Sequence, residues 1–162
     1  RHGAAAVADW QHVGIVPSAM MNFLALLGWS PKNDLELMSS AEMIDHFDVA
    51  SLLKAPSIFD PKKLEWMNGQ HMLGMTAEEL VPFLAPLLAK DGMPPSWIAP
   101  PDPRVAAVIE VCRVRARTTI QLAEQIRVFF ERPDLSAMIP AENRRDKGWD
   151  GLPCTTAIAH SL

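Results

Sequence analysis

The sequence predicts an all-α protein, and three of its features carry that prediction. Its 162 residues include nine methionines and several leucine- and alanine-rich runs, and unbranched side chains lose little rotamer freedom in a helix. Apolar residues recur every three or four positions, which is the period of one buried helical face. Residue patterns that cap helices also occur several times. We therefore expect fewer than about a tenth of the residues in strands, against about a fifth to a quarter in ordinary domains.

Two helices are expected before residue 30. The first covers residues 5–13 and stops at Gly14, because glycine tolerates the positive φ that often ends a helix. The second begins at Pro17, where the missing N–H of proline would be unpaired in any case, and ends at Gly28. Its residues are apolar on nearly every face, so we expect this helix to be buried on most sides.

A third helix is expected after residue 39. Ser39 and Glu42 match a capping box, in which the hydroxyl and the carboxylate each accept a hydrogen bond from a free N–H of the first turn. We expect this helix to direct three apolar side chains toward the core, namely Met43, Ile44 and Phe47.

Two more helices are expected between residues 60 and 90. Asp60 directly before Pro61 is a capping residue followed by a proline at the first helical position. Thr76 and Glu79 match a second capping box. We expect Pro86 to kink or shorten the helix that this box opens, because proline removes one hydrogen bond of the helix interior.

The region after residue 90 contains a proline-rich stretch and two further helices. Residues 91–103 predict a stiff connector and a subdomain boundary. The next helix repeats apolar residues at i, i+3, i+4 and i+7, namely Val105, Val108, Ile109 and Cys112. Thr118 or Thr119 caps the last helix, which ends at Pro133. Residues 134–162 have weak periodicity and are expected to be loosely ordered.

The distribution of charge limits the functions open to this chain. Its formal net charge is −4, whereas a nucleic-acid-binding protein usually has a basic face. The charge is uneven, however, because residues 104–132 contain six arginines and three glutamates. A local basic patch can bind phosphate even on an acidic chain.

Several other classes of protein find no support in the sequence. No apolar run reaches the roughly 18 residues that a membrane-spanning helix needs. Cys112 falls on an apolar helical stripe and Cys154 is an isolated thiol, and a disulfide or metal site would need an oxidising context or more ligands. The histidines also lack paired helical spacing, so we expect neither kind of site. No set of nucleophile and base, and no phosphate-binding glycine loop, is recognisable. We therefore assign no catalytic residue and no metal ligand.

Three ordered blocks nevertheless resemble one family closely. They are Pro17–Ser30, Glu42–Asp48 and Phe59–Gly69, the last reading Phe-Asp-Pro-Lys-Lys-Leu-Glu-Trp-Met-Asn-Gly. Their order and spacing are similar to bacterial-type glutamyl-tRNA synthetases, in the stretch that follows the lysine-rich signature loop of class I synthetases. Arg1, followed by His-Gly, resembles the end of that loop. The resemblance is dense over residues 1–73 and weaker over 74–133, and it fails after Pro133.

The resemblance implies an organisation for the chain. Residues 1–73 would be a helical stem-contact region that follows the signature loop, and residues 74–133 an anticodon-binding helical bundle. Residues 134–162 would be a divergent tail. The chain would be a tRNA-binding fragment that is inactive alone, because the catalytic nucleotide-binding domain, which would lie upstream, is absent from the sequence.

The resemblance also implies binding residues. Lys62, Lys63 and Trp66 lie in the block that contacts the inner side of the tRNA in the family, where lysine can meet phosphate and a tryptophan ring can stack. Packing is the alternative role for Trp66. Arg1 would lie near the ATP site, a frayed terminus being the alternative.

The segment from Arg113 to Arg117 is the strongest candidate for RNA contact. Arg113 and Arg115 fall on the two flanks of the apolar helical stripe, and guanidinium groups suit bidentate recognition of phosphate. Arg115, Arg117 and Thr118 match a basic segment of the anticodon-binding part of the family. A solvated basic turn is the alternative.

Cofactors and partners follow from the same resemblance. The intact enzyme would use ATP and magnesium to attach glutamate to its tRNA, whereas this fragment would bind neither cofactor. We expect a cytoplasmic monomer whose partner is the glutamate tRNA, and the sequence leaves open whether glutamine tRNA is also a partner. The rival interpretation is a free-standing helical adaptor that binds RNA or protein.

Overall fold

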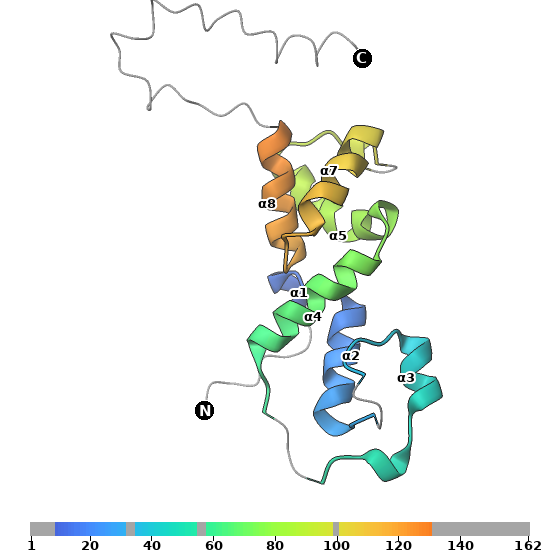
Figure 1. The fold of residues 1–162 in the computed structure, drawn as a ribbon. Coiled ribbons are helices and arrows are strands. Elements are labelled where there is room, and N and C mark those ends of the chain that lie inside the picture. Colours follow the sequence, from blue (N-terminus) through green and yellow to red (C-terminus); the bar gives the residue numbers. More distant parts are fainter. Residues whose placement is uncertain (1–8, 32–34, 55–57, 99–100, 131–162) are drawn as a thin grey trace, which may run out of the picture. The chain divides into compact units, whose positions relative to one another are not determined.

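The computed structural model describes residues 9–31, 35–54, 58–98 and 101–130, and most of these residues are helical (Figure 1). No strand occurs in these ranges, and the only β-type pairing among them is an isolated bridge between Trp29 and Leu52. The prediction of an all-α fold is confirmed.

The helices follow one another along the chain. Their bounds are α1 Asp9–Val13, α2 Pro17–Gly28, α3 Ser40–His46, the 3₁₀ helix η1 Val49–Ser51, α4 Pro61–Gly74, α5 Ala77–Lys90, α6 Pro95–Ile98, α7 Pro103–Arg113 and α8 Thr119–Phe130. Residues 1–130 form one compact unit. The predicted division after residue 73 stays a prediction, and the predicted tail, residues 134–162, lies outside the described residues.

Both predicted capping boxes are confirmed. Ser39 Oγ accepts from the Glu42 N–H at 3.3 Å, while Glu42 Oε2 accepts from the Ser39 N–H at 2.8 Å. Thr76 and Glu79 form the same pair of bonds, at 3.2 and 2.8 Å. Each box satisfies two N–H groups that the first turn of a helix leaves free, which is why α3 and α5 begin where the sequence predicts.

The helix α5 is not shortened at Pro86, since it continues to Lys90, and the predicted kink stays a prediction. Three leucines spaced by four residues are fully buried along it, namely Leu80, Leu84 and Leu88. Burial of this row compensates for the hydrogen bond that a proline removes from the helix interior.

Two expectations about burial are wrong. Ile44 and Phe47 do not point inward, because α3 has only seven residues and Phe47 lies beyond its end; their side chains are 79% and 54% exposed. The helix α2 is not buried on most sides, since it packs mainly against α4 and α3. Met21 and Leu24 therefore remain exposed.

The main core lies between α2, α4, α5, α6, α7 and α8, and the short α6 contributes Ile98 to it. The helix α4 contacts both α2 and α7, whereas α5, α7 and α8 contact one another (Figure 1). The almost completely buried side chains of the main core include Ala19, Leu64, Met67, Leu80, Leu84, Leu88, Val105, Ile109, Leu122 and Ile126. A separate, smaller cluster contains Trp29, Met38 and Met43. No helix in the described part of the chain is long and apolar enough to cross a membrane.

Candidate nucleic-acid interface

The turn between α7 and α8 is attached to the middle of α4 through Asn68. This side chain is completely buried. Its Oδ1 accepts from the Val16 N–H at 2.8 Å, and its Nδ2 donates to the carbonyls of Gly14 at 3.2 Å and Arg117 at 2.6 Å. Because a buried backbone group without a partner is strongly unfavourable, these bonds specify where three segments of the chain meet.

Gly14 completes this junction. Its φ of +86° suits glycine, and a Cβ at this position would lie 2.9 Å from both the Ile120 nitrogen and the Thr119 Oγ1. Its carbonyl also accepts from the Thr119 N–H at 2.9 Å. Glycine therefore permits both the turn before α2 and the close approach of α8.

The Arg117 side chain lies across α4 at Gly69. A Cβ on Gly69 would lie 3.1 Å from Arg117 Cδ, 3.5 Å from Arg117 Nη1 and 3.3 Å from the Ala116 carbonyl oxygen. The absence of a side chain at Gly69 leaves room for the arginine stem, while Arg117 as a whole remains exposed. Arginine commonly rests its aliphatic stem on a surface in this way and leaves its charged end in water.

The face of α4 that contains Lys62 and Trp66 continues to Gly69, on which Arg117 rests. Lys62, Trp66 and Gly69 are spaced by four and three residues, so they lie along one stripe of the helix, opposite the buried Leu64 and Met67. Trp66 is 36% exposed. Since residues i and i+3 are neighbours on a helix, Trp66 lies one helical turn from Gly69, where the arginine stem rests. We call Lys62, Trp66 and Arg117 the α4 outer surface.

The cations of this region differ in whether they have partners. Among the described residues, the side chains of Lys62, Arg115 and Arg117 have no ion-pair or hydrogen-bond partner. Lys63 donates to Glu36 Oε1 at 2.6 Å, although both side chains are about half exposed. The cations Lys62, Arg115 and Arg117 are therefore available to an anionic ligand.

Arg113 is held within the fold. Its guanidinium donates to the Met75 carbonyl and pairs with Glu110, and its side chain is only 19% exposed. It thus connects α7 to the end of α4. A role for Arg113 or Lys63 in RNA binding stays a prediction, and Arg1 lies outside the described residues.

The sequence analysis assigned no role to Asn68 or Gly69, although both belong to the block that resembles the family. The available signal was a polar residue and a glycine in the middle of a helix, where both are unfavourable without a tertiary reason. Asn22, inside the apolar α2, has the same signal. Its Oδ1 accepts from the Met38 N–H at 3.0 Å and lies 3.0 Å from His71 Nε2.

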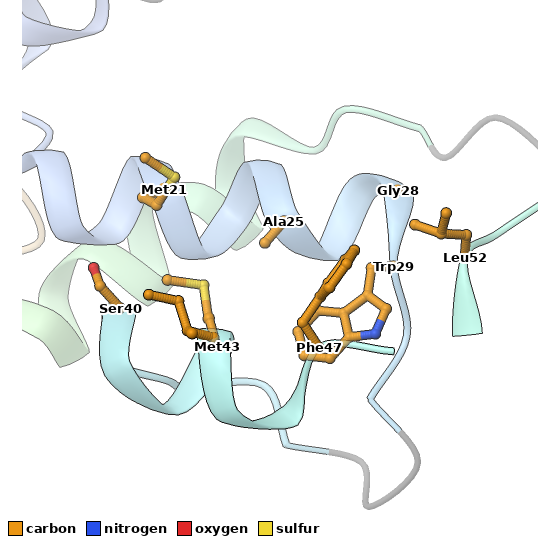
Figure 2. A pocket seen from close by; sticks show the side chains of 9 residues that line it. Met21, Ala25, Gly28, Trp29, Ser40, Met43, Phe47 and Leu52 are labelled. Atoms are coloured by element: carbon orange, nitrogen blue, oxygen red, sulfur yellow. The ribbon is translucent and has the colours of Figure 1, made fainter. Parts of the chain in front are cut away.

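A pocket lies between α2 and α3 (Figure 2). This pocket, of about 500 Å³, is lined by Met21, Ala25, Gly28, Trp29, Ser40, Met43, Ile44, Phe47 and Leu52. No titratable side chain lines it, so it has no group for acid–base catalysis. Within the described ranges, no group of three or more His, Cys, Asp or Glu residues could hold a metal ion.

Comparison with known proteins relates this chain to one group of enzymes. The family model for the catalytic domain of class I tRNA synthetases (E and Q) matches residues 1–66. Glutamate–tRNA ligase 1 of Fervidobacterium nodosum is 38% identical over 133 residues, which cover 82% of this chain and 27% of that protein. The corresponding ligase of Pseudothermotoga lettingae is 38% identical over 138 residues, covering 83% and 28%. This chain thus spans about a quarter of the length of these curated relatives.

Two solved structures share the fold. One is a glutamate tRNA ligase from Elizabethkingia meningosepticum in complex with its amino acid, with a TM-score of 0.66 and 28% identity over 77% of this chain and 24% of that chain. The other is the glutamate–tRNA synthetase from Elizabethkingia anophelis, with a TM-score of 0.64, 28% identity and the same coverage of both chains. The interpretation of residues 1–73 as a stem-contact region stays a prediction, because the family model that matches most of them describes a catalytic domain. Sequence identity and shared fold together show that this chain is homologous to the glutamate–tRNA ligases.

Proposed function

We propose that this chain is a tRNA-binding part of a glutamate–tRNA ligase, and that the α4 outer surface contacts the tRNA. The observation that carries the proposal is that Lys62, Trp66 and Arg117 share one exposed surface, on which both cations lack ionic partners among the described residues. Homology to the ligases supports this ligand and does not favour the rival interpretation as a free-standing adaptor.

Each group on this surface has a distinct task in the proposal. Lys62 supplies a mobile charge that meets phosphate without selecting sequence. Arg117 offers a planar guanidinium that can bind a phosphate through two parallel hydrogen bonds. Trp66 presents part of its ring, on which an unpaired base or a ribose can stack. Arg115, exposed in the following turn, extends the same positive charge.

The longer protein, in our proposal, attaches glutamate to its tRNA with ATP and magnesium. In the described part, the carboxylates form no cluster that fits a metal ion, so we assign no step of that reaction to these residues. Their task is to dock the tRNA and orient its acceptor end. Residues 1–73 would contact the stem and residues 74–133 the anticodon arm, in a cytoplasmic monomer that binds the glutamate isoacceptor.

Binding of a bacterial glutamate tRNA transcript to the chain, measured at several salt concentrations, tests the proposal. Each lost phosphate contact should reduce the slope of log affinity against log salt by about 0.7–0.9. We expect this reduction for Lys62→Ala and for Arg117→Ala, and weaker binding for Trp66→Ala through lost stacking.

Lys90→Ala removes an equal charge at the end of α5, outside the α4 outer surface, and serves as the matched control. It should change the slope less than Lys62→Ala does. Identical salt slopes for Lys62→Ala, Arg117→Ala and Lys90→Ala would show that tRNA does not recognise this surface.

A further inference from the structure

We infer that Gly69 is a positioning residue for RNA binding. Because Gly69 has no side chain, the surface of α4 at this position, which we call the seat, has room for the Arg117 stem. The inference rests on the function proposed above and assigns a task to a residue that itself offers no group to a ligand. It concerns how the guanidinium is held before RNA arrives.

The backbone of Arg117 is fixed from both sides. Its carbonyl accepts from Asn68 Nδ2 at 2.6 Å, and its N–H donates to Gln121 Oε1 at 2.9 Å. Asn68 is completely buried and also bonds to Val16 and Gly14. The start of the arginine side chain is therefore placed relative to α4 by hydrogen bonds on both sides of its Cα.

Gly69 then determines the direction of the side chain. A Cβ there would approach Arg117 Cδ to 3.1 Å and the Ala116 carbonyl oxygen to 3.3 Å, both closer than ordinary van der Waals contact. An added Cβ therefore requires the arginine stem and the Ala116 carbonyl to shift by a few tenths of an ångström, which changes how the stem lies on the helix. With glycine, the stem lies one turn from Trp66, so that both groups can meet one ligand.

This arrangement lowers the entropy lost when RNA binds. A free arginine side chain samples many rotamers, and ordering it opposes association. An arginine that already lies along α4 loses less freedom when it contacts a phosphate. The seat thus contributes to affinity without adding a contact.

The substitution Gly69→Ala tests the inference, with Gly74→Ala as its matched control. Both glycines lie in α4, and a Cβ on Gly74 has no atom within 4 Å. Alanine favours helix over glycine, so α4 should be retained in both variants, as far-UV circular dichroism would verify. We expect Gly69→Ala to weaken binding of a bacterial glutamate tRNA transcript at least about twofold, the lower range for directly coupled residues. Gly74→Ala should bind like the parent.

A double-mutant cycle with Arg117→Ala identifies the cause of any loss. If the seat acts through the arginine, Gly69→Ala should have no further effect once Arg117 is alanine. The Arg117 Nε–H resonance should also shift in Gly69→Ala, without RNA, and stay in place in Gly74→Ala.

The outcomes separate the two ideas. If Arg117→Ala weakens binding but Gly69→Ala does not, the seat is refuted and the proposed function stands. Additive losses in the cycle refute the seat equally. If Arg117→Ala binds like the parent, Arg117 is not an RNA contact, and the inference fails together with that part of the proposed function.

Discussion

The main core and the small cluster between α2 and α3 contain similar side chains, but they differ greatly in how far they are shielded from solvent. The main core contains buried side chains from six helices, and Leu64 within it is completely buried. The small cluster has three buried members, and beside it Phe47 stacks on Trp29 with ring centroids 5.9 Å apart while remaining more than half exposed (Figure 2). The difference follows from the number of neighbouring helices, because a seven-residue helix packed on one partner cannot cover both of its apolar sides.

Two buried asparagines show the same contrast. Asn68, beside the main core, uses both its oxygen and its amide nitrogen in hydrogen bonds to backbone groups. Asn22, which holds the segment before α3, uses its oxygen, while its buried Nδ2 has no partner among the described residues. A fully satisfied polar group stabilises one geometry, whereas a partly satisfied one is a source of strain. We expect the α4 junction to be the more rigid of the two.

The largest expected effect is at the centre of the main core. Leu64→Ala should reduce the free energy of unfolding by about 2–5 kcal/mol, because it removes a fully buried side chain and leaves a cavity. Ile44→Ala, beside the small cluster, should change it by less than about 0.5 kcal/mol, since Ile44 is mostly exposed. Urea unfolding measures both. Equal losses would show that α3 is packed as tightly as the main core.

The second prediction compares the two asparagines. Asn68→Ala leaves the Val16 N–H and the carbonyls of Gly14 and Arg117 without this partner, so we expect a loss of about 3 kcal/mol. Asn22→Ala also removes an amide that was unsatisfied, and its loss should be about 1 kcal/mol. Urea midpoints of the two variants decide the order. A larger loss for Asn22→Ala would contradict the proposed difference in rigidity.

The third prediction concerns the two capping boxes, which have nearly the same bond lengths. Thr76→Ala should reduce the free energy of global unfolding by about 1 kcal/mol, since α5 belongs to the main core. Ser39→Ala should act mainly on α3 and appear as faster amide hydrogen exchange there, with a smaller shift of the global transition. If both variants shift the global transition equally, α3 unfolds together with the rest.

The smallest effect is a dependence on pH at His71. Burial lowers the pKa of His71 below its ordinary value of 6.5, and Nε2 must carry the proton because the Asn22 oxygen beside it can only accept. The unfolded chain therefore binds a proton more readily than the folded chain. The stabilising contribution of neutral His71 is complete above the unfolded pKa and declines as the pH falls from about 6.5 through the lower folded pKa.

Urea unfolding at about pH 8 and about pH 5.5 measures this effect. His71→Gln keeps a donor of similar reach but does not titrate, so part of the loss of stability toward acid should disappear. An unchanged pH dependence in His71→Gln would show that this histidine is not linked to folding.

Local chemistry was sufficient to predict most helix boundaries. The caps at Ser39, Asp60 and Thr76 form where the sequence places them, since a capping bond needs only residues two or three positions apart. The prolines at positions 17 and 61 each occupy a first helical turn for the same local reason. The all-α class and the resemblance to glutamyl-tRNA synthetases also followed from the sequence.

Which apolar and polar side chains are covered was decided only by the tertiary structure. Helical periodicity shows that Met43 and Ile44 are apolar neighbours, but only the position of α2 determines that Met43 is buried and Ile44 is exposed. The candidate site also depends on tertiary packing. Lys62, Trp66 and Arg117 were predicted separately, and the contact between Arg117 and Gly69 joins residues 48 positions apart. Neither helical period nor capping preference extends beyond a few neighbours in the chain, so this pairing arises only when α4 packs against the turn before α8.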